Sequence, residues 1–159
     1  MTGNGKHEAA CGVAIQGRTP WMLHVALAAL RRQGLELQSL PACSGEACSW
    51  ARDVAECLQR GDCQGAVLFC DDAGACCCVT NKVAGVRAAS VWSVAQAERA
   101  VLGFGANLLV VETAGRTYFE FKEILRLGAS PRECPDGVAC VLADLEHARP
   151  GNGAAHAHR

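Results

Sequence analysis

The segment that decides the fold runs from Leu68 to Ala89 and reads LFCDDAGACCCVTNKVAGVRAA. An apolar run, Ala66–Cys70, ends at two acidic residues, Asp71 and Asp72, and a second apolar run follows at Val86–Val91. Short apolar runs closed by turn residues are typical of buried strands. The segment between them is long enough for a short helix, and a strand, helix and strand in succession predict parallel strands.

The same alternation extends over most of the chain. Further strands are predicted at Cys11–Ile15, Leu35–Leu40 and Leu108–Val111. One helix is predicted to start at Thr19-Pro20, with Thr19 as its N-cap, and a second to start at Ser49, which would be its N-cap. Three further helices are predicted at Val94–Leu102, Thr117–Leu127 and Gly137–Ala148. Strands separated by helices predict right-handed crossovers and a sheet covered on both faces. We therefore expect an α/β, Rossmann-like three-layer sandwich with a five-stranded parallel sheet and a C-terminal closing helix. It should span residues 11–149, between a disordered N-terminus (1–10) and a disordered tail (150–159).

Composition and charge narrow the class of protein. The net charge is −1 and the basic residues are scattered, which argues against nucleic acid as a partner because phosphate binding needs a concentrated positive surface. No apolar run approaches the roughly 18 residues that span a bilayer, so no membrane association is expected. The first ten residues lack the apolar core of a signal peptide. These features predict a cytoplasmic location.

The chain has 11 cysteines, and we interpret them as reduced thiols that serve as small hydrophobic residues. Several lie in apolar, periodic segments: Cys57, Cys70 and Cys140. Cys43 and Cys48, and the adjacent Cys76-Cys77-Cys78, do not have the spacing of structural zinc ligands. We therefore expect no metal and no cofactor.

Ligands of parallel α/β sheets bind beyond the carboxyl ends of the strands. In this chain that edge is formed by the loops at Gln16–Thr19, Cys70–Ala75 and Val91–Ser93. A ligand site is therefore expected where these three loops meet.

The Leu68–Ala89 segment resembles the signature of the type B ribose-5-phosphate isomerases and their relatives, the galactose-6-phosphate isomerase subunits. The matching residues are Cys70, Asn81, Lys82, Val83, Gly85, Arg87, Ala88 and Ala89, and the match continues to Ala106-Asn107. The resemblance extends from Gly12 to Ala148. It implies conversion between aldose and ketose phosphates through an enediolate. It also implies an active site between two subunits, with the closing helix reaching across to the neighbour.

Position by position, much of the catalytic apparatus that the resemblance implies is replaced. The base is implied either at Cys70, which is retained, or at a Glu further along the loop. Gly17 and Arg18 stand where an Asp-His pair is implied, and Trp92 stands at the position of a ring-opening histidine. Phosphate ligands are implied in the closing helix, where this chain has Val138 and Val141. Cys70 is thus the single candidate catalytic residue, and the candidate ligand-binding residues are Gly17, Arg18, Asp71, Asp72, Ala73, Gly74, Asn81, Arg87, Trp92 and Asn107.

Two of these positions have alternative interpretations. Asp71 and Asp72 would repel an enediolate and a phosphate if they faced the ligand, or they form an N-cap pair for the short helix that follows. Arg18 supplies a new phosphate contact, or it is a solvated cation in a loop.

Three functions are compatible with this pattern. The chain is a catalytically impaired family member with a binding, assembly or regulatory role. Alternatively, it is one subunit of a hetero-oligomeric isomerase that includes a complete paralogue, or it is an active isomerase of an altered sugar. The expected assembly is a homodimer or homotetramer, or in the second case a hetero-oligomer with the complete paralogue, and the expected ligand is a sugar phosphate unless the substrate is altered.

Overall fold

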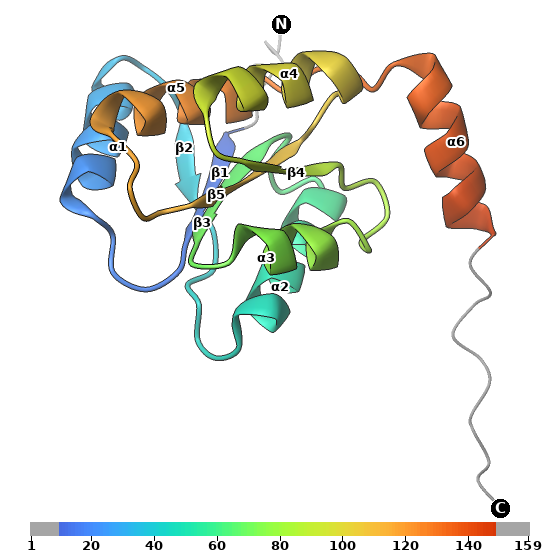
Figure 1. Ribbon diagram of the computed structural model, residues 1–159, viewed down its shortest axis with the longest axis horizontal. Helices are drawn as coiled ribbons and strands as arrows, with labels where there is room; N and C mark the ends of the chain where they lie inside the picture. The colour runs from blue at the N-terminus through green and yellow to red at the C-terminus, as the bar shows by residue number, and fades with distance from the viewer. Residues whose placement is uncertain (1–9, 149–159) are drawn as a thin grey trace, which may run out of the picture.

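The computed structural model describes residues 10–148; the predicted terminal segments 1–9 and 149–159 lie outside the described residues. Within residues 10–148 the chain forms a five-stranded, fully parallel sheet between two layers of helices (Figure 1). The strands are β1 (Cys11–Ile15), β2 (Leu37–Ser39), β3 (Ala66–Cys70), β4 (Ala88–Val91) and β5 (Leu108–Glu112), in the order β2-β1-β3-β5-β4. The three-layer α/β fold expected from the sequence is confirmed.

The helices divide between the two faces of the sheet. They are α1 (Trp21–Arg32), α2 (Ala47–Gln59), α3 (Ala73–Thr80), α4 (Val94–Phe104), α5 (Tyr118–Gly128) and α6 (Asp136–His147). Helices α1, α4 and α5 cover one face and α2 and α3 the other (Figure 1). Helix α6 stands away from both layers beyond β4, and none of its residues is buried.

Strand β3 lies at the centre of the sheet, between β1 and β5, and all of its residues are buried. Its side chains alternate between the two hydrophobic clusters that the sheet separates. Phe69 packs edge-to-face on Phe121 of α5, with ring centroids 5.5 Å apart. Burial on both faces explains why β3 is almost continuously apolar.

Several element boundaries differ from the prediction. Helix α2 is capped by Glu46 rather than Ser49, because the Glu46 carboxylate accepts hydrogen bonds from the backbone N–H groups of Cys48 and Ser49, at 2.9 and 2.8 Å. Helix α1 has Pro20 at its N-cap and no side-chain cap. The first strand residues predicted for β2 and β4 instead belong to turns: Leu35 N–H donates to Leu30 and Val86 N–H to Val83.

The cysteine prediction holds in part. Cys57 and Cys70 are buried, as expected, but Cys140 is exposed because α6 packs against neither layer. No helix within residues 10–148 is long and apolar enough to cross a membrane.

Candidate functional site

The carboxyl ends of the strands bring together loops that lie far apart in the sequence. Asp71, after β3, donates its backbone N–H to the side-chain oxygen of Gln16, after β1, at 3.0 Å. Thr113, after β5, donates its backbone N–H to the carbonyl oxygen of Cys70 at 3.1 Å. The loops after β1, β3 and β5 therefore form one connected surface at this edge.

Cys70 ends β3, but its thiol lies in the core. The residue is 0% exposed and packs in the hydrophobic cluster between the sheet and helices α2 and α3. Burial, together with the neighbouring thiol of Cys76, which is hydrogen-bonded to it, raises the pKa of Cys70 far above its ordinary value. A protonated thiol with no exposed surface is a poor base and a poor nucleophile.

In the turn after Cys70, a side chain of the turn itself bonds a backbone N–H group. Asp72 is the N-cap of α3, and its carboxylate accepts the backbone N–H of Ala75 at 2.9 Å. Asp71 takes part through its backbone N–H, which bonds Gln16, and its side chain does not cap the helix. The capping interpretation is thus confirmed for Asp72 and is wrong for Asp71. Ala73, the first residue of α3, is fully buried, whereas Gly74 is exposed.

The loop after β1 carries Gly17 and Arg18, both exposed. Gly17 has φ of +69°, a left-handed conformation that glycine adopts without strain. Arg18 lines an open depression of about 540 Å³ together with the start of α1. There Trp21 stacks on His24, with ring centroids 6.1 Å apart.

Arg116, in the loop after β5, is a residue that the sequence analysis missed. Its guanidinium donates to the carbonyl oxygen of Trp92 and forms an ion pair with Glu120 at 3.4 Å, while its Nε is buried without a hydrogen-bond partner. The side chain is only 18% exposed. Trp92, by contrast, is 51% exposed. The signal for Arg116 was its position in the loop that follows β5, a strand inside the sheet whose loop the prediction did not include.

The remaining candidates, Asn81, Arg87 and Asn107, lie at the opposite, amino-terminal edge of β4 and β5. Asn81 holds the start of β4 through both its amide oxygen and nitrogen, which bond Ala88 at 2.8 and 3.0 Å. Asn107 accepts the backbone N–H of Arg87 at 2.7 Å, and Arg87 Nε donates to Gly105 at 2.7 Å. These residues fasten the edge strand and are not brought together with Cys70.

Among residues 10–148, neither a histidine nor a metal cluster joins the group around Cys70. Of the described histidines, His24 lies in α1, and His147 ends α6 with its ring nitrogen bonded to the carbonyl oxygen of Ala143. Within residues 10–148 no group of three or more His, Cys, Asp or Glu side chains is placed to hold a metal ion.

A family model described as Ribose/Galactose Isomerase matches residues 23–126. The chain belongs to the ribose/galactose isomerase family. The match covers β3 and the turn at Cys70, so the resemblance expected from the Leu68–Ala89 segment is confirmed. No curated protein matched the sequence.

Solved structures of this family share the fold. The ribose 5-phosphate isomerase of Thermotoga maritima superposes with a TM-score of 0.73 at 16% identity, over 89% of this chain and 99% of that one. The type B enzyme of Trypanosoma cruzi gives 0.66 at 22% identity, over 87% and 95% of the two chains. The Mycoplasma genitalium ribose-5-phosphate isomerase B, solved with bound ribulose-5-phosphate, gives 0.65 at 19%, over 87% and 94%.

Proposed function

We propose that the protein is a ribose/galactose isomerase family member that has lost isomerase activity on ribose 5-phosphate and acts through binding or assembly. The observation that carries this proposal is the state of the turn after Cys70. An enediolate needs free backbone N–H donors. Here the N–H of Asp71 is taken by Gln16 and that of Ala75 by Asp72.

Charge adds to this loss. Asp71 and Asp72 are exposed at the carboxyl edge of the sheet, where the substrate of a parallel α/β enzyme would lie. Like charges about 4 Å apart repel by about 4 kcal/mol at the effective dielectric constant near a protein surface. The negative charge that develops on an enediolate is therefore disfavoured beside these carboxylates.

Proton transfer is also unsupported. The Cys70 thiol is buried and its pKa is raised, so it does not offer a thiolate near neutral pH. Trp92 occupies the position at which the resemblance implies a histidine, and an indole N–H donates but does not shuttle protons. General acid–base catalysis contributes roughly 10²–10⁴-fold. Its loss alone would reduce turnover to a small fraction of that of a complete enzyme.

Binding of a phosphorylated ligand is supported by Arg116. Its guanidinium lies at the carboxyl edge, is always charged and keeps some exposed surface, although its unpartnered Nε is buried and its Nη1 is bonded to Trp92 and Glu120. Arginine pairs favourably with phosphate because its N–H groups match the phosphate oxygens. We therefore assign sugar-phosphate binding without turnover as the remaining capacity of the site.

The test measures activity and binding on the same preparation. Aldose–ketose conversion of ribose 5-phosphate is assayed for the wild type, Asp72→Thr, Trp92→His and Cys70→Ala, and binding of ribose 5-phosphate by calorimetry for the wild type and Arg116→Gln. We expect no turnover, and measurable binding that Arg116→Gln weakens. Ordinary enzymatic rates that Cys70→Ala abolishes would overturn the proposal, and turnover of a non-phosphorylated sugar would favour an altered substrate.

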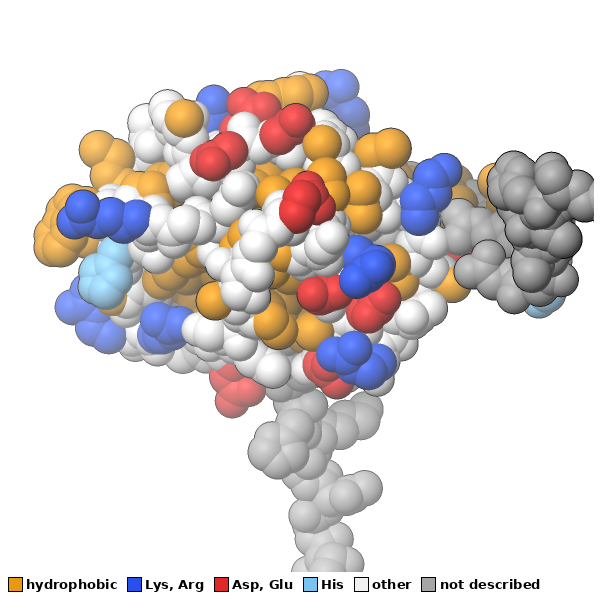
Figure 2. Space-filling model, turned by 90° about the horizontal axis from the view of Figure 1, so that it is seen from below, with side chains coloured by type: hydrophobic (Ala, Val, Ile, Leu, Met, Phe, Trp, Pro, Cys, Tyr) orange, Lys and Arg blue, Asp and Glu red, His pale blue; other side chains and the backbone are white. Residues whose placement is uncertain are grey.

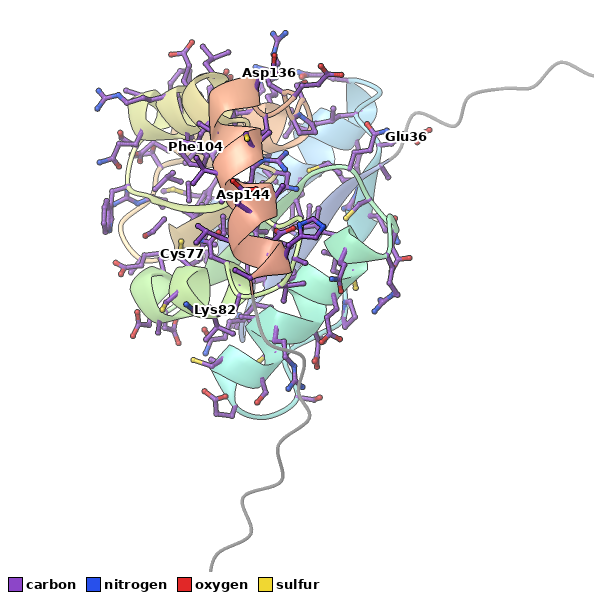
Figure 3. All side chains as sticks on the ribbon, turned by 90° about the vertical axis from the view of Figure 1, so that its right-hand side faces the viewer. Glu36, Cys77, Lys82, Phe104, Asp136 and Asp144 are labelled. Atoms are coloured by element: carbon purple, nitrogen blue, oxygen red, sulfur yellow. The ribbon has the colours of Figure 1, made fainter. Side chains whose placement is uncertain are left out.

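A second candidate, a subunit of a mixed oligomer, is favoured by α6. The helix exposes Val138, Val141 and Leu145, and an open groove of about 300 Å³ separates it from the body. Figure 3 shows α6 from Asp136 to Asp144 in front of the body, with Phe104 of α4 behind it. An exposed apolar stripe on a helix that its own domain does not cover suits a neighbouring chain. Copurification of a complete paralogue, with activity restored on mixing, would support this candidate. A helix α6 variant, Leu145→Arg, should then fail to copurify it.

A further inference from the structure

Trp21, the first residue of α1, leaves 76% of its surface in solvent. Tryptophan is highly buried on average, and Trp50 of this chain is only 4% exposed. The fold does not depend on the Trp21 ring, because α1 contacts the core through the buried side chains of Leu23, Ala26, Leu27 and Leu30. A large aromatic ring that the fold leaves uncovered is the kind of side chain on which recognition sites are built.

The indole ring of Trp21 is held in place by its neighbours in the chain. His24 lies on the same face of the helix, because residues three apart are neighbours on a helix surface. The two rings stack with their centroids 6.1 Å apart and their planes at 23°. Pro20, whose φ is fixed by its ring, precedes Trp21 as the N-cap. The pair of rings therefore forms an aromatic platform that is ordered before any ligand arrives.

The aromatic platform lines an open depression of about 540 Å³, together with Arg18, Thr19 and Pro20. This volume is within the range of small-molecule sites. Arg18 is exposed, and within residues 10–148 its guanidinium forms neither an ion pair nor a hydrogen bond. Figure 2 shows a histidine between basic side chains at the end of the molecule where α1 lies, with hydrophobic side chains beside it and no acidic side chain next to it.

A cation beside an aromatic platform favours a ligand that has both a planar ring and an anionic group. Arginine N–H groups match the oxygens of a phosphate, and every nucleic-acid base has a π-face that can stack on an aromatic side chain. The first backbone hydrogen bond of α1 runs from the N–H of His24 to the carbonyl oxygen of Pro20, and no side chain caps the N–H groups before it. This helix end alone would attract any anion, so the aromatic platform decides the class of ligand.

From these observations we infer that the depression at Arg18, Trp21 and His24 binds a nucleoside monophosphate. The base stacks on the exposed face of Trp21, and the phosphate pairs with Arg18. One guanidinium matches a single phosphate group better than a chain of phosphates. The inference goes beyond the proposed function and does not depend on it, because neither Arg116 nor the turn after Cys70 lines this depression.

The experiment measures, by calorimetry on the full chain, the affinities for AMP, adenosine and ribose 5-phosphate. AMP carries a base and a phosphate, whereas adenosine lacks the phosphate and ribose 5-phosphate lacks the base. We expect AMP to bind about tenfold more tightly than adenosine, because only AMP pairs with Arg18. Added salt should weaken the binding of AMP and leave that of adenosine unchanged. Ribose 5-phosphate tests the proposed function separately.

Two substitutions at exposed positions test the two contacts. Trp21→Ala should weaken AMP binding by about tenfold and leave the affinity for ribose 5-phosphate unchanged, because it removes the stacking of the base alone. Arg18→Gln should weaken AMP binding by about tenfold and leave the affinity for adenosine unchanged. The matched controls are Met22→Ala, 51% exposed in the same turn, and Arg31→Gln, exposed in the last turn of α1. Both should bind AMP as the wild type does.

Stacking of the base can also be observed directly, because a base that stacks on an indole quenches its fluorescence. The chain has three tryptophans, of which Trp50 is buried, so Trp92→Phe leaves Trp21 as the exposed one. AMP should quench the fluorescence of Trp92→Phe and should not quench that of Trp21→Ala.

The inference is overturned if the wild type does not bind AMP at about 1 mM, or if Trp21→Ala binds it as the wild type does. It is also overturned if Met22→Ala and Arg31→Gln weaken AMP binding as much as the substitutions at the site. Binding to vesicles of anionic phospholipid through Trp21, without binding of AMP, would overturn it in favour of a membrane surface. Retained AMP binding with no binding of ribose 5-phosphate would support the inference and overturn the proposed sugar-phosphate binding alone.

Discussion

The turn after Cys70 can be reopened by removing the two side chains that close it. Gln16→Ala frees the backbone N–H of Asp71, and Asp72→Ala frees that of Ala75. A hydrogen bond of this kind contributes about 1 kcal/mol, and loss of an N-cap costs about 1 kcal/mol. For a domain of this size about 1 kcal/mol corresponds to roughly 2–4 °C in Tm. Each variant should therefore melt a few degrees lower, and the double variant by up to about twice as much.

The two losses need not add, because Asp71 and Asp72 are adjacent in the same turn. Thermal unfolding of both single variants and the double variant measures the coupling. Gln16→Glu keeps an acceptor for the N–H of Asp71 and should restore most of the loss. Gln64 is an exposed glutamine in a loop, so Gln64→Ala is the control for the loss of a glutamine side chain elsewhere in the protein.

Freed donors should also be detectable as anion binding. Titration with inorganic phosphate, followed by calorimetry, should show tighter binding to Gln16→Ala/Asp72→Ala than to the wild type. Asp72→Asn keeps the helix cap but removes the negative charge. Comparison with this variant therefore shows whether phosphate binding is limited by repulsion from the carboxylate or by the lack of free N–H donors. Equal Tm and equal phosphate affinity in the wild type and the double variant would refute the argument that these side chains close the turn.

Three further outcomes can be measured directly. Cys78 is exposed and should react rapidly with a thiol reagent, whereas Cys70 should react only on unfolding, because burial raises its pKa. Mass spectrometry of partly labelled protein measures the extent of labelling at both cysteines. The Glu120 carboxylate accepts a hydrogen bond from the backbone N–H of Thr117, which lowers the pKa of Glu120. The stability that this carboxylate contributes is therefore present above the ordinary carboxyl pKa and is lost as the pH falls through the lowered pKa of Glu120. Denaturant titrations of the wild type and Glu120→Gln should therefore converge in acid. Gly105→Ala should lower the free energy of unfolding by more than about 1 kcal/mol, because φ is +67° and a Cβ would lie 2.7 Å from a backbone oxygen before α6; urea unfolding measures it.

The core of the fold was predictable because it depends on local pattern. Strand β3 matches its predicted range because five apolar residues end at acidic ones, and α5 begins directly after its N-cap Thr117, whose capping box with Glu120 is a local motif. The start of β4 was misplaced because it is set by contacts across the chain. Asn81 and Asn107 anchor the strand from elements on either side, and no periodicity in Val86–Val91 reveals them.

The site was harder to predict because residue type does not determine orientation. Cys70 lies at the end of β3, as predicted from the sequence, but its thiol is buried in the hydrophobic core. Gln16 was within a loop expected to bind ligand, but its bond to Asp71 joins the ends of two neighbouring strands that lie 55 residues apart, and it has no sequence signal. Arg116 escaped notice because the loop after β5 lay outside the segment that resembles the signature.

The strand order has a consequence for synthesis. Strands β2 and β3 both pair with β1, so these three strands have their partners early in the chain, but β4 pairs only with β5, which follows it in the chain. Until Leu108–Glu112 has been translated, β4 has no strand partner and β3 has an open edge at the centre of the future sheet. Chains released early would present that bare hydrophobic edge to other nascent chains and to chaperones. Completion of this fold is therefore tied to the arrival of a single late strand.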